Sequence, residues 1–361
     1  MLNFILRRCW LMALTAVCLT LIVFFLTNLQ PNLQKLAKAE GSVRMSDESV
    51  GLWLDQNGFG SPVLERYGEW LGVVPGWIFV DEKGVTRGRC IPNGSDPALA
   101  PAYCGLLQGS WGTSTTFKEP VSKTLSRGLG HTAWLMLAVM CVMVPTALLL
   151  GVVAGMREGS RTDRVLSTVA IATTATPEYV SGVILVALFA SASVGLSPIL
   201  KDWGWISTKT LFMGTATSAM ENITFWNFTL PVLTIALYGI GYIARMTRAS
   251  MTEVMTQQYI RTARLKGVGF NQVVIRHALR NALIAPFTVI MLQFPWLLNG
   301  VVIVETLFNY KGFGWTLVQA AGNNDIELLL GCSVVAVLVV LVTQLMSDIG
   351  YVFLNPRIRL T

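Results

Sequence analysis

The amino-acid sequence predicts an all-α membrane protein with six transmembrane helices and a small irregular insertion between the first two. Of its 361 residues, 53% are hydrophobic and only 13% are charged, whereas a soluble domain carries about 25% charged residues. Six apolar runs approach the roughly 20 residues that a helix needs to cross a bilayer. The net charge of +7 does not indicate nucleic acid as a partner, because a soluble chain that binds nucleic acid would be less apolar.

The predicted spans cover approximately residues 9–29, 131–155, 165–190, 228–246, 282–305 and 328–354. The first apolar run is longer than the roughly 7–15 residues of a signal-peptide core. We therefore expect an uncleaved signal anchor, with cleavage near Ala37-Lys38-Ala39 as the alternative. Several spans contain a proline, namely Pro145, Pro177, Pro231 and Pro295. These prolines indicate either helix packing or spans beside an aqueous path.

Basic residues predict the orientation of the chain. The non-membrane pieces on the side of the N-terminus carry 14 Lys and Arg in 61 residues, and the other pieces carry 13 in 158. Basic residues near span ends mark the cytoplasmic side. Both termini and residues 245–281 are therefore predicted to be cytoplasmic, and residues 30–128 to lie outside.

Four regions follow from this topology. They are a tail with the first span (1–29), an extracytoplasmic loop domain (30–128), a core with the second to sixth spans (129–354) and a cytoplasmic tail (355–361). Cys90 and Cys104 lie in the loop domain, joined by a Pro/Gly/Asn-rich stretch. In an oxidising compartment this pattern indicates a disulfide, and two free thiols are the alternative.

A basic segment, residues 257–286, lies between two apolar runs and holds five Lys and Arg and no acid. Ser250 and Glu253 have capping-box spacing and predict a helix start. Four residues fall at i, i+4, i+7 and i+8 on one helical face: Tyr259, Ala263, Lys266 and Gly267. Gly267 and Gly269 are expected to end that helix, and a second helix over NQVVIRHALRNALIAP returns to the membrane. Composition alone also fits a loop against anionic membrane lipid.

The stretch YIRTARLKG followed by HALRNAL resembles the cytoplasmic signature of binding-protein-dependent ABC transporter permeases. More narrowly, the chain resembles the dipeptide/oligopeptide permease family, in the subunit with a long first external loop. Further matches in order are FILRR, GSWGTS, LPVLTIAL, ETLFNYKGFGWTLVQAAGNND and SDIGYVFLNPRIRL. The resemblance therefore covers nearly the whole chain.

The chain departs from the broad permease signature in three places. Its first three positions, Glu-Ala-Ala, are Arg261-Thr262-Ala263 here, a form common in the peptide branch. Its final Ile-x-Leu-Pro is His277-Ala278-Leu279-Arg280, and the usual Asp-Pro-Arg ending is Asn355-Pro356-Arg357. These departures favour the peptide branch over the sugar and amino-acid branches.

The resemblance implies an ABC importer permease fold in which residues 250–281 dock in a cleft of an ATPase subunit. On this interpretation Ala263 and Gly267 allow close contact, beside Tyr259 and Thr262. Arg261, Arg264 and Lys266 supply polar contacts. The second helix is fixed by Arg276, His277, Arg280 and Asn281. A structural hydrogen bond at the membrane surface is an equal alternative for His277.

The resemblance also implies the partners. They are a second homologous permease subunit, one or two ABC ATPase subunits that hold ATP and Mg, and an extracytoplasmic solute-binding protein, all at a bacterial inner membrane. The chain has no Gly-x-x-x-x-Gly-Lys-Ser/Thr phosphate loop, so ATP hydrolysis is expected on another chain and no cofactor on this one. The two histidines are far apart and the thiols are not clustered, so no metal site is predicted. The sequence also shows no nucleophile–base arrangement that would indicate an enzyme.

Three residues in the third span, Pro177, Glu178 and Tyr179, are candidates for the substrate path, because an acid at membrane depth is expensive. A hydrated kink is the alternative. Glu305 and Asp325 flank FNYKGFGW, which either closes the pore from outside or is a turn built on its glycines.

The sequence thus predicts the pore-forming subunit of an ATP-driven importer, in the first place for di- and oligopeptides. An importer for a nickel chelate, an opine or an oligosaccharide is one alternative. An ion-coupled secondary transporter is another, although that class usually shows buried ionisable residues and inverted repeats. A membrane receptor or enzyme working through residues 30–128 is the third.

Overall fold

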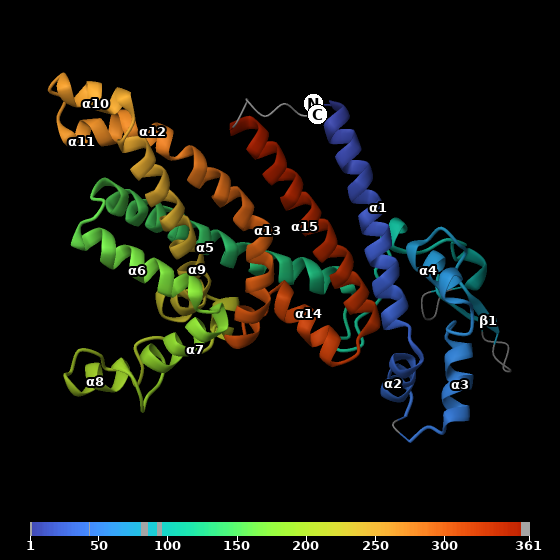
Figure 1. The fold of residues 1–361 in the computed structure, drawn as a ribbon. Coiled ribbons are helices and arrows are strands. Elements are labelled where there is room, and N and C mark those ends of the chain that lie inside the picture. The colour runs from blue at the N-terminus through green and yellow to red at the C-terminus, as the bar shows by residue number, and fades with distance from the viewer. Residues whose placement is uncertain (1, 43, 81–85, 92–95, 355–361) are drawn as a thin grey trace. The chain divides into compact units, whose positions relative to one another are not determined.

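The computed structural model describes residues 2–42, 44–80, 86–91 and 96–354, so the predicted tail 355–361 lies outside the described part. The chain divides into two compact units. Unit 1 comprises Met1–Arg127 and Thr316–Val339, and unit 2 comprises Gly128–Trp315 and Val340–Thr361. Nearly all regular elements are helices (Figure 1), as predicted.

The first half of the chain contains α1 (Leu2–Thr27), α2 (Gln30–Glu40), α3 (Asp47–Gln56), α4 (Val63–Leu71), β1 (Ile78–Val80), β2 (Thr86–Gly88), short 3₁₀ turns at Pro97–Leu99 and Leu106–Gln108, α5 (Val121–Met156), α6 (Arg161–Ala175) and α7 (Glu178–Phe189). The second half contains α8 (Leu196–Asp202), a 3₁₀ turn at Thr217–Met220, α9 (Phe225–Met255), α10 (Gln258–Leu265), α11 (Phe270–Gln272), a π-helix (Val273–Ala278), α12 (Leu279–Ala282), α13 (Ile284–Leu307), α14 (Phe313–Gly322) and α15 (Ile326–Leu354).

Within the described residues, four helices are long and apolar enough to cross a membrane, namely α1, α5, α9 and α15. Two bent pairs of helices pass the same test together. One is α6 with α7, and the other is Phe270–Ala282 with the start of α13. Counting each pair as one span gives the six spans that the sequence predicts.

The third predicted span is not one continuous helix. Its two parts, α6 and α7, meet at 108°. Thr176 ends α6 with extended backbone (φ −91°, ψ 121°), and Pro177 precedes α7. A proline has no N–H to donate and disfavours the helical region for the residue before it. The third predicted span therefore consists of two helices with a break at Pro177, the proline that the sequence places inside it.

Unit 1 carries the predicted loop domain as short helices and one hairpin. Strands β1 and β2 pair antiparallel, with Phe79 opposite Arg87. The disulfide predicted from the sequence joins Cys90 to Cys104, whose Cα atoms are 5.4 Å apart. The buried apolar side chains of this unit are Phe24, Leu33, Leu36, Ala37, Val50, Leu54, Tyr67, Trp70, Ile326, Leu330 and Val334. Trp70 belongs to this small core, and Trp53 and Trp111 pack against it.

Asp325 fixes the start of α15 within unit 1. Its carboxylate accepts hydrogen bonds from the Ser114 hydroxyl (2.5 Å) and the Thr116 N–H (3.0 Å). Its other oxygen accepts from the Leu328 N–H at 3.2 Å. Asp325 is fully buried, so it caps the helix and holds the preceding segment of the loop domain in place.

Unit 2 is built around α9, which packs against α5, α6, α7, α12 and α13. Gly151 and Gly155 of α5 lie four residues apart and face it. A Cβ at Gly155 would meet the Met251 Cβ at 2.5 Å, and one at Gly151 would collide with Thr247. Small residues at this spacing let two membrane helices approach closely. A movement of the end of α9 is therefore tightly linked to α5.

Candidate coupling site and substrate path

The basic segment begins near the end of α9. Helix α9 continues to Met255, and Ser250 lies inside it, so the predicted helix start at Ser250 was wrong. The Ser250 hydroxyl instead donates a hydrogen bond to the Ala282 carbonyl at 2.7 Å, which ties α9 to α12. Helix α10 starts after Gln257, and Figure 1 shows α10, α11 and α12 gathered at the end of α9.

Gly267 ends α10 in a Schellman motif. The Gly267 N–H donates to the Arg264 carbonyl (3.0 Å) and the Val268 N–H to the Ala263 carbonyl (3.2 Å). Gly267 has φ +78°, in the left-handed region that favours glycine. A Cβ at Gly267 would meet nothing within 4 Å, so the backbone conformation, and not crowding, requires glycine here.

The returning arm is helical but not uniform. It consists of α11, the π-helix over Val273–Ala278, and α12. It joins α13 at a bend of 49°. The sequence predicted one regular helix here, and the π-helix was not foreseen. Such π-turns often occur at functional sites.

The segment thus has two arms, α10 and the returning arm, which pack together through an apolar inner face. Ile260 is fully buried and Ala263 is 8% exposed, both facing the returning arm. The other buried members of this cluster are Met251, Val273, Val274, Ala278 and Ala282. Ala263 therefore lies inside the segment, where it holds the two arms together. The prediction that its side chain directly contacts a partner is corrected accordingly. Residues 250–282, packed in this way, are called the coupling unit below.

The coupling unit also carries exposed apolar side chains, which are taken below to form its outer face. Leu265 is 80% exposed, Ile275 68% and Phe270 47%. The sequence analysis did not single out these three residues. The signal that could have identified them is that other apolar residues already fill the inner face. Exposed apolar side chains grouped on one surface mark interaction sites.

The same coupling unit also carries exposed cations. Arg261, Arg264, Lys266, Arg276 and Arg280 are all exposed. Within the described part of the chain, none of the five makes an ion pair with a carboxylate. The Arg264 guanidinium lies 5.9 Å from the centroid of the Phe270 ring, a cation–π contact across the turn. The surface is thus apolar and positively charged.

The other predicted residues have local roles. The Asn281 side-chain amide donates to the Tyr259 hydroxyl at 2.9 Å, which joins the first arm to the second. The Thr262 hydroxyl donates to the Gln258 carbonyl one turn earlier (3.0 Å). His277 is half-buried. These contacts stiffen the coupling unit.

The coupling unit is also braced from α6. Asp163 binds Arg248 of α9, and the Asp163 carboxylate further accepts from the Gly159 N–H (2.9 Å) and the Ser167 hydroxyl (3.1 Å). Asp163 is 3% exposed. The end of α9 is thereby fixed to the turn between α5 and α6.

The candidate substrate-path residues lie at the α6–α7 break. Pro177 immediately precedes α7, and Glu178 is its first residue. Tyr179 is 52% exposed. Glu178 is half-buried, and its carboxylate makes no hydrogen bond or ion pair with the residues that the structure describes. The break therefore leaves its carboxylate available to another molecule.

Glu305 organises the FNYKGFGW turn. Its carboxylate is fully buried and accepts hydrogen bonds from the Thr132 hydroxyl (2.5 Å) and the Trp315 N–H (3.0 Å). A Cβ at Gly312 would collide with this carboxylate. The glycine of this turn therefore makes room for Glu305.

Tyr310 closes the same turn. Its hydroxyl donates to the His131 carbonyl at 2.8 Å, and burial raises the pKa of the phenol. Among the described residues there is no group of three or more His, Cys, Asp or Glu that could hold a metal ion.

Comparisons with known proteins place this geometry in a family. Residues 147–360 match the family described as binding-protein-dependent transport system inner membrane component. The chain is 32% identical over 99% of both chains to a di/tripeptide transport system permease protein of Pseudomonas aeruginosa (strain UCBPP-PA14). It is 31% identical, over 70% of this chain and 76% of the relative, to a glutathione transport system permease protein of Salmonella choleraesuis (strain SC-B67).

Among solved structures, the crystal structure of an amino acid ABC transporter with histidines matches 64% of this chain and 94% of that chain, at 15% identity and a TM-score of 0.47. The family match covers more than half of the chain, and the relationship to the Pseudomonas permease covers nearly all of it. The chain therefore belongs to the binding-protein-dependent transport system inner membrane component family, as a multi-pass, pore-forming permease subunit and not an enzyme.

Proposed function

We propose that the chain forms part of the pore of an ATP-driven importer of di- and oligopeptides. The observation that carries this proposal is the 32% identity to a di/tripeptide permease over 99% of both chains. That similarity includes residues 30–128, the segment that most distinguishes this subunit. A relative named as a probable peptide ABC transporter permease protein, from Sinorhizobium fredii, supports the same substrate class.

The coupling unit is proposed to dock in a cleft of an ATPase subunit. Its support is the outer face on which Leu265, Phe270 and Ile275 lie among unpaired cations. Anchors of this kind are typical of interface centres, and charges at their edge select the partner. ATP and Mg would be held by that partner, and no cofactor by this chain.

The docked unit would pass movement to the membrane helices as a rigid body. The two arms share a buried inner face, Ser250 binds Ala282, and Arg248 is held by Asp163. Helix α9 packs closely on α5 through Gly151 and Gly155. Because packed helices shift as blocks, a displacement of the coupling unit would tilt α9 and α5 together.

The proposed assembly contains a second permease subunit of similar fold, one or two ATPase subunits and an extracytoplasmic solute-binding protein. The proposed location is a bacterial inner membrane, and the distribution of basic residues supports a cytoplasmic side for the coupling unit and both termini. Peptide would cross near Pro177, Glu178 and Tyr179, where the Glu178 carboxylate could meet a peptide ammonium group.

The test is uptake by proteoliposomes that contain this chain with its genetically neighbouring permease, ATPases and binding protein. We expect ATP-dependent uptake of labelled dialanine, and its loss without the ATPases. Preferential uptake of a nickel chelate, an opine or an oligosaccharide would contradict the peptide assignment. Uptake that needs an ion gradient and no ATP would contradict the coupling assignment.

A further inference from the structure

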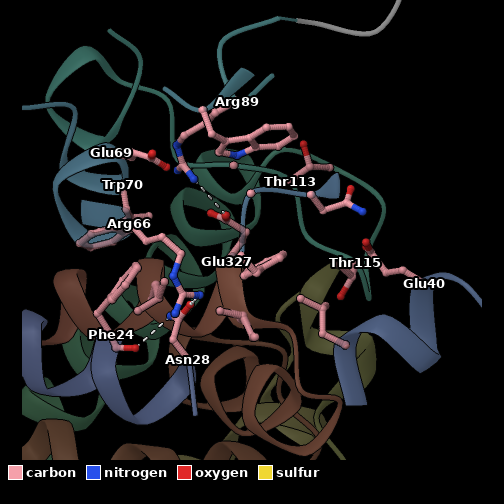
Figure 2. A pocket seen from close by; sticks show the side chains of 18 of the residues that line it. Phe24, Asn28, Glu40, Arg66, Glu69, Trp70, Arg89, Thr113, Thr115 and Glu327 are labelled. Carbon is pink, nitrogen blue, oxygen red and sulfur yellow. Dashed lines mark hydrogen bonds and ion pairs between the residues drawn. The ribbon is translucent and has the colours of Figure 1, made fainter. Parts of the chain in front are cut away.

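Unit 1 contains a cavity of about 450 Å³ between the loop domain, the end of α1 and the start of α15 (Figure 2). This volume is within the roughly 300–1,000 Å³ of small-molecule sites. The described part of the chain brings five charged side chains to its lining: Glu40, Arg66, Glu69, Arg89 and Glu327. The cavity is separate from the coupling unit and from the α6–α7 break.

Arg66 of α4 is an incompletely paired cation in this cavity. It is only 7% exposed, and its Nη1 donates to the Asn28 Oδ1 at 2.9 Å. Its Nε has no partner among the described residues. The guanidinium lies 5.8 Å from the centroid of the Phe59 ring, and burial lowers its pKa. A buried cation with an unused donor is costly unless something else binds it.

Glu69 lies three residues after Arg66 on the same helix. It is 5% exposed, and its carboxylate accepts no hydrogen bond from the residues that the structure describes. Burial raises the pKa of its carboxyl, and the positive charge of Arg89 opposes that effect. In Figure 2 the Glu69 and Arg66 side chains both reach the cavity. Glu69 thus offers a buried negative charge without hydrogen-bond donors, and Arg66 a buried positive charge with an unused donor.

Arg89 and Glu327 face each other without a short hydrogen bond. The Arg89 Nη1 is 3.7 Å from the Glu327 Oε1, beyond the usual hydrogen-bond distance of about 3.2 Å. The Arg89 Nε and the Glu327 Oε2 have no partner among the described residues. Three buried side-chain atoms without a partner among the described residues, the Arg66 Nε, the Arg89 Nε and the Glu327 Oε2, therefore belong to the lining of this one cavity.

The unpaired groups distinguish a ligand site from a structural ion network. A purely structural ion network would satisfy its own members, because buried polar groups in native proteins are nearly always hydrogen-bonded. A ligand site leaves groups of the needed charge unpaired until the ligand binds. The aromatic walls at Trp53, Trp70 and Trp77 also fit a ligand with apolar parts.

We propose that this cavity binds a short peptide by its two charged ends. The peptide carboxylate would bind the Arg66 guanidinium, and the peptide ammonium group would bind Glu69 and Glu327. A single amide-linked pair of residues carries both charges and fits the volume. That the ligand is the transported peptide rests on the proposed function. The cavity would then hold peptide in the loop domain before or after it crosses the pore.

The experiment measures binding of L-alanyl-L-alanine to the purified full chain in nanodiscs, without a binding protein, by calorimetry and tryptophan fluorescence. We expect saturable binding. N-acetyl-dialanine lacks the ammonium group and dialanine amide lacks the carboxylate, so each should bind at least tenfold more weakly, because hydrogen bonds to charged groups are strong. Glu69→Gln and Arg66→Gln should weaken binding to the same degree.

Arg87→Gln is the matched control, because Arg87 is exposed on β2 and does not line the cavity. If Arg66→Gln does not fold, the nearly isosteric Glu69→Gln carries the test. No saturable binding at millimolar dialanine, equal binding of the blocked peptides, or unchanged binding by Glu69→Gln would overturn the proposal. Uptake by the reconstituted importer without such binding would overturn this inference alone. Binding without uptake of any peptide would overturn the proposed function alone.

Discussion

Asp163 of α6 binds Arg248 of α9 in a bidentate pair. The Arg248 Nε donates to Oδ1 at 2.5 Å and Nη2 donates to Oδ2 at 2.8 Å. The Asp163 side chain is 4% exposed and that of Arg248 is 31% exposed. Two parallel charged hydrogen bonds fix orientation as well as distance. The pair therefore determines how the last turns of α9, and the coupling unit beyond them, are held against α6.

Replacing the Asp163 carboxylate should destabilise the contact between α6 and the end of α9. We expect Asp163→Asn to lower the free energy of unfolding by about 1–3 kcal/mol, because a charged hydrogen-bonded pair is lost and one partner stays partly buried. Thermal unfolding of the detergent-purified chain checks this. Asp202→Asn, at an exposed position on α8, is the control. Equal melting of the two variants would mean that the pair adds nothing to stability.

Gly267 and Gly269 offer a matched test of backbone strain. Gly267 has φ +78° and Gly269 has φ −59°, and a Cβ at either would meet open space. Gly267→Ala should destabilise by about 1–2 kcal/mol, because L-residues disfavour the left-handed region. Gly269→Ala should be neutral. Similar melting temperatures for both would show that the Schellman turn does not need glycine.

A test of docking at Gly267 must separate backbone strain from side-chain bulk, because a substitution such as Gly267→Arg would introduce both. Gly267→Asn separates them, since asparagine tolerates the left-handed region.

The exposed apolar face predicts a docking defect without a folding defect. Leu265→Glu should leave the stability of the chain within about 0.5 kcal/mol, as surface substitutions usually do. It should reduce co-purification of the ATPase subunit at least tenfold, because buried interface anchors carry most of the binding energy. Leu99→Glu is the control, at 85% exposure on a separate turn. Normal ATPase recovery with Leu265→Glu would rule out this face as the docking surface.

Sequence periodicity and composition were enough for the membrane helices but not for their breaks. Pro145 and Pro231 lie inside the unbroken helices α5 and α9, whereas the chain bends at Pro177. All three remove the same donor. What differs is whether neighbouring helices hold the chain straight, and a single sequence does not contain that information.

The coupling unit shows a second limit. The capping-box spacing at Ser250 predicted a helix start, but tertiary packing of α9 overrides it and the hydroxyl binds Ala282 instead. Ala263 was assigned to the outer surface by helical spacing from Tyr259. The structure instead buries it beside Ile260. The spacing of Ala263 from Ile260 is as compatible with one helical face as its spacing from Tyr259, so periodicity alone did not decide between the two faces.

The Cys90–Cys104 disulfide predicts selective labelling. Maleimide should not modify either residue before reduction, since both sulfur atoms are bonded to each other. After reduction both should react, and the loop domain should lose roughly 3 kcal/mol of stability, as expected for a loop of about 15 residues. Mass spectrometry of labelled peptides measures the first effect and thermal unfolding the second. Full labelling of both residues without reductant would contradict the disulfide.

Glu305 provides the last prediction. Its two oxygens accept from the Thr132 hydroxyl and the Trp315 N–H, and Glu305 is fully buried. In Glu305→Gln one oxygen becomes an NH₂ group, which cannot accept a hydrogen bond, so either the Thr132 hydroxyl or the Trp315 N–H loses its acceptor. We expect a loss of about 1–3 kcal/mol in unfolding free energy. Glu221→Gln, at an exposed position, should have no effect. If Glu305→Gln melts like this control, the turn between α13 and α14 does not depend on a carboxylate, and its glycines alone explain its shape.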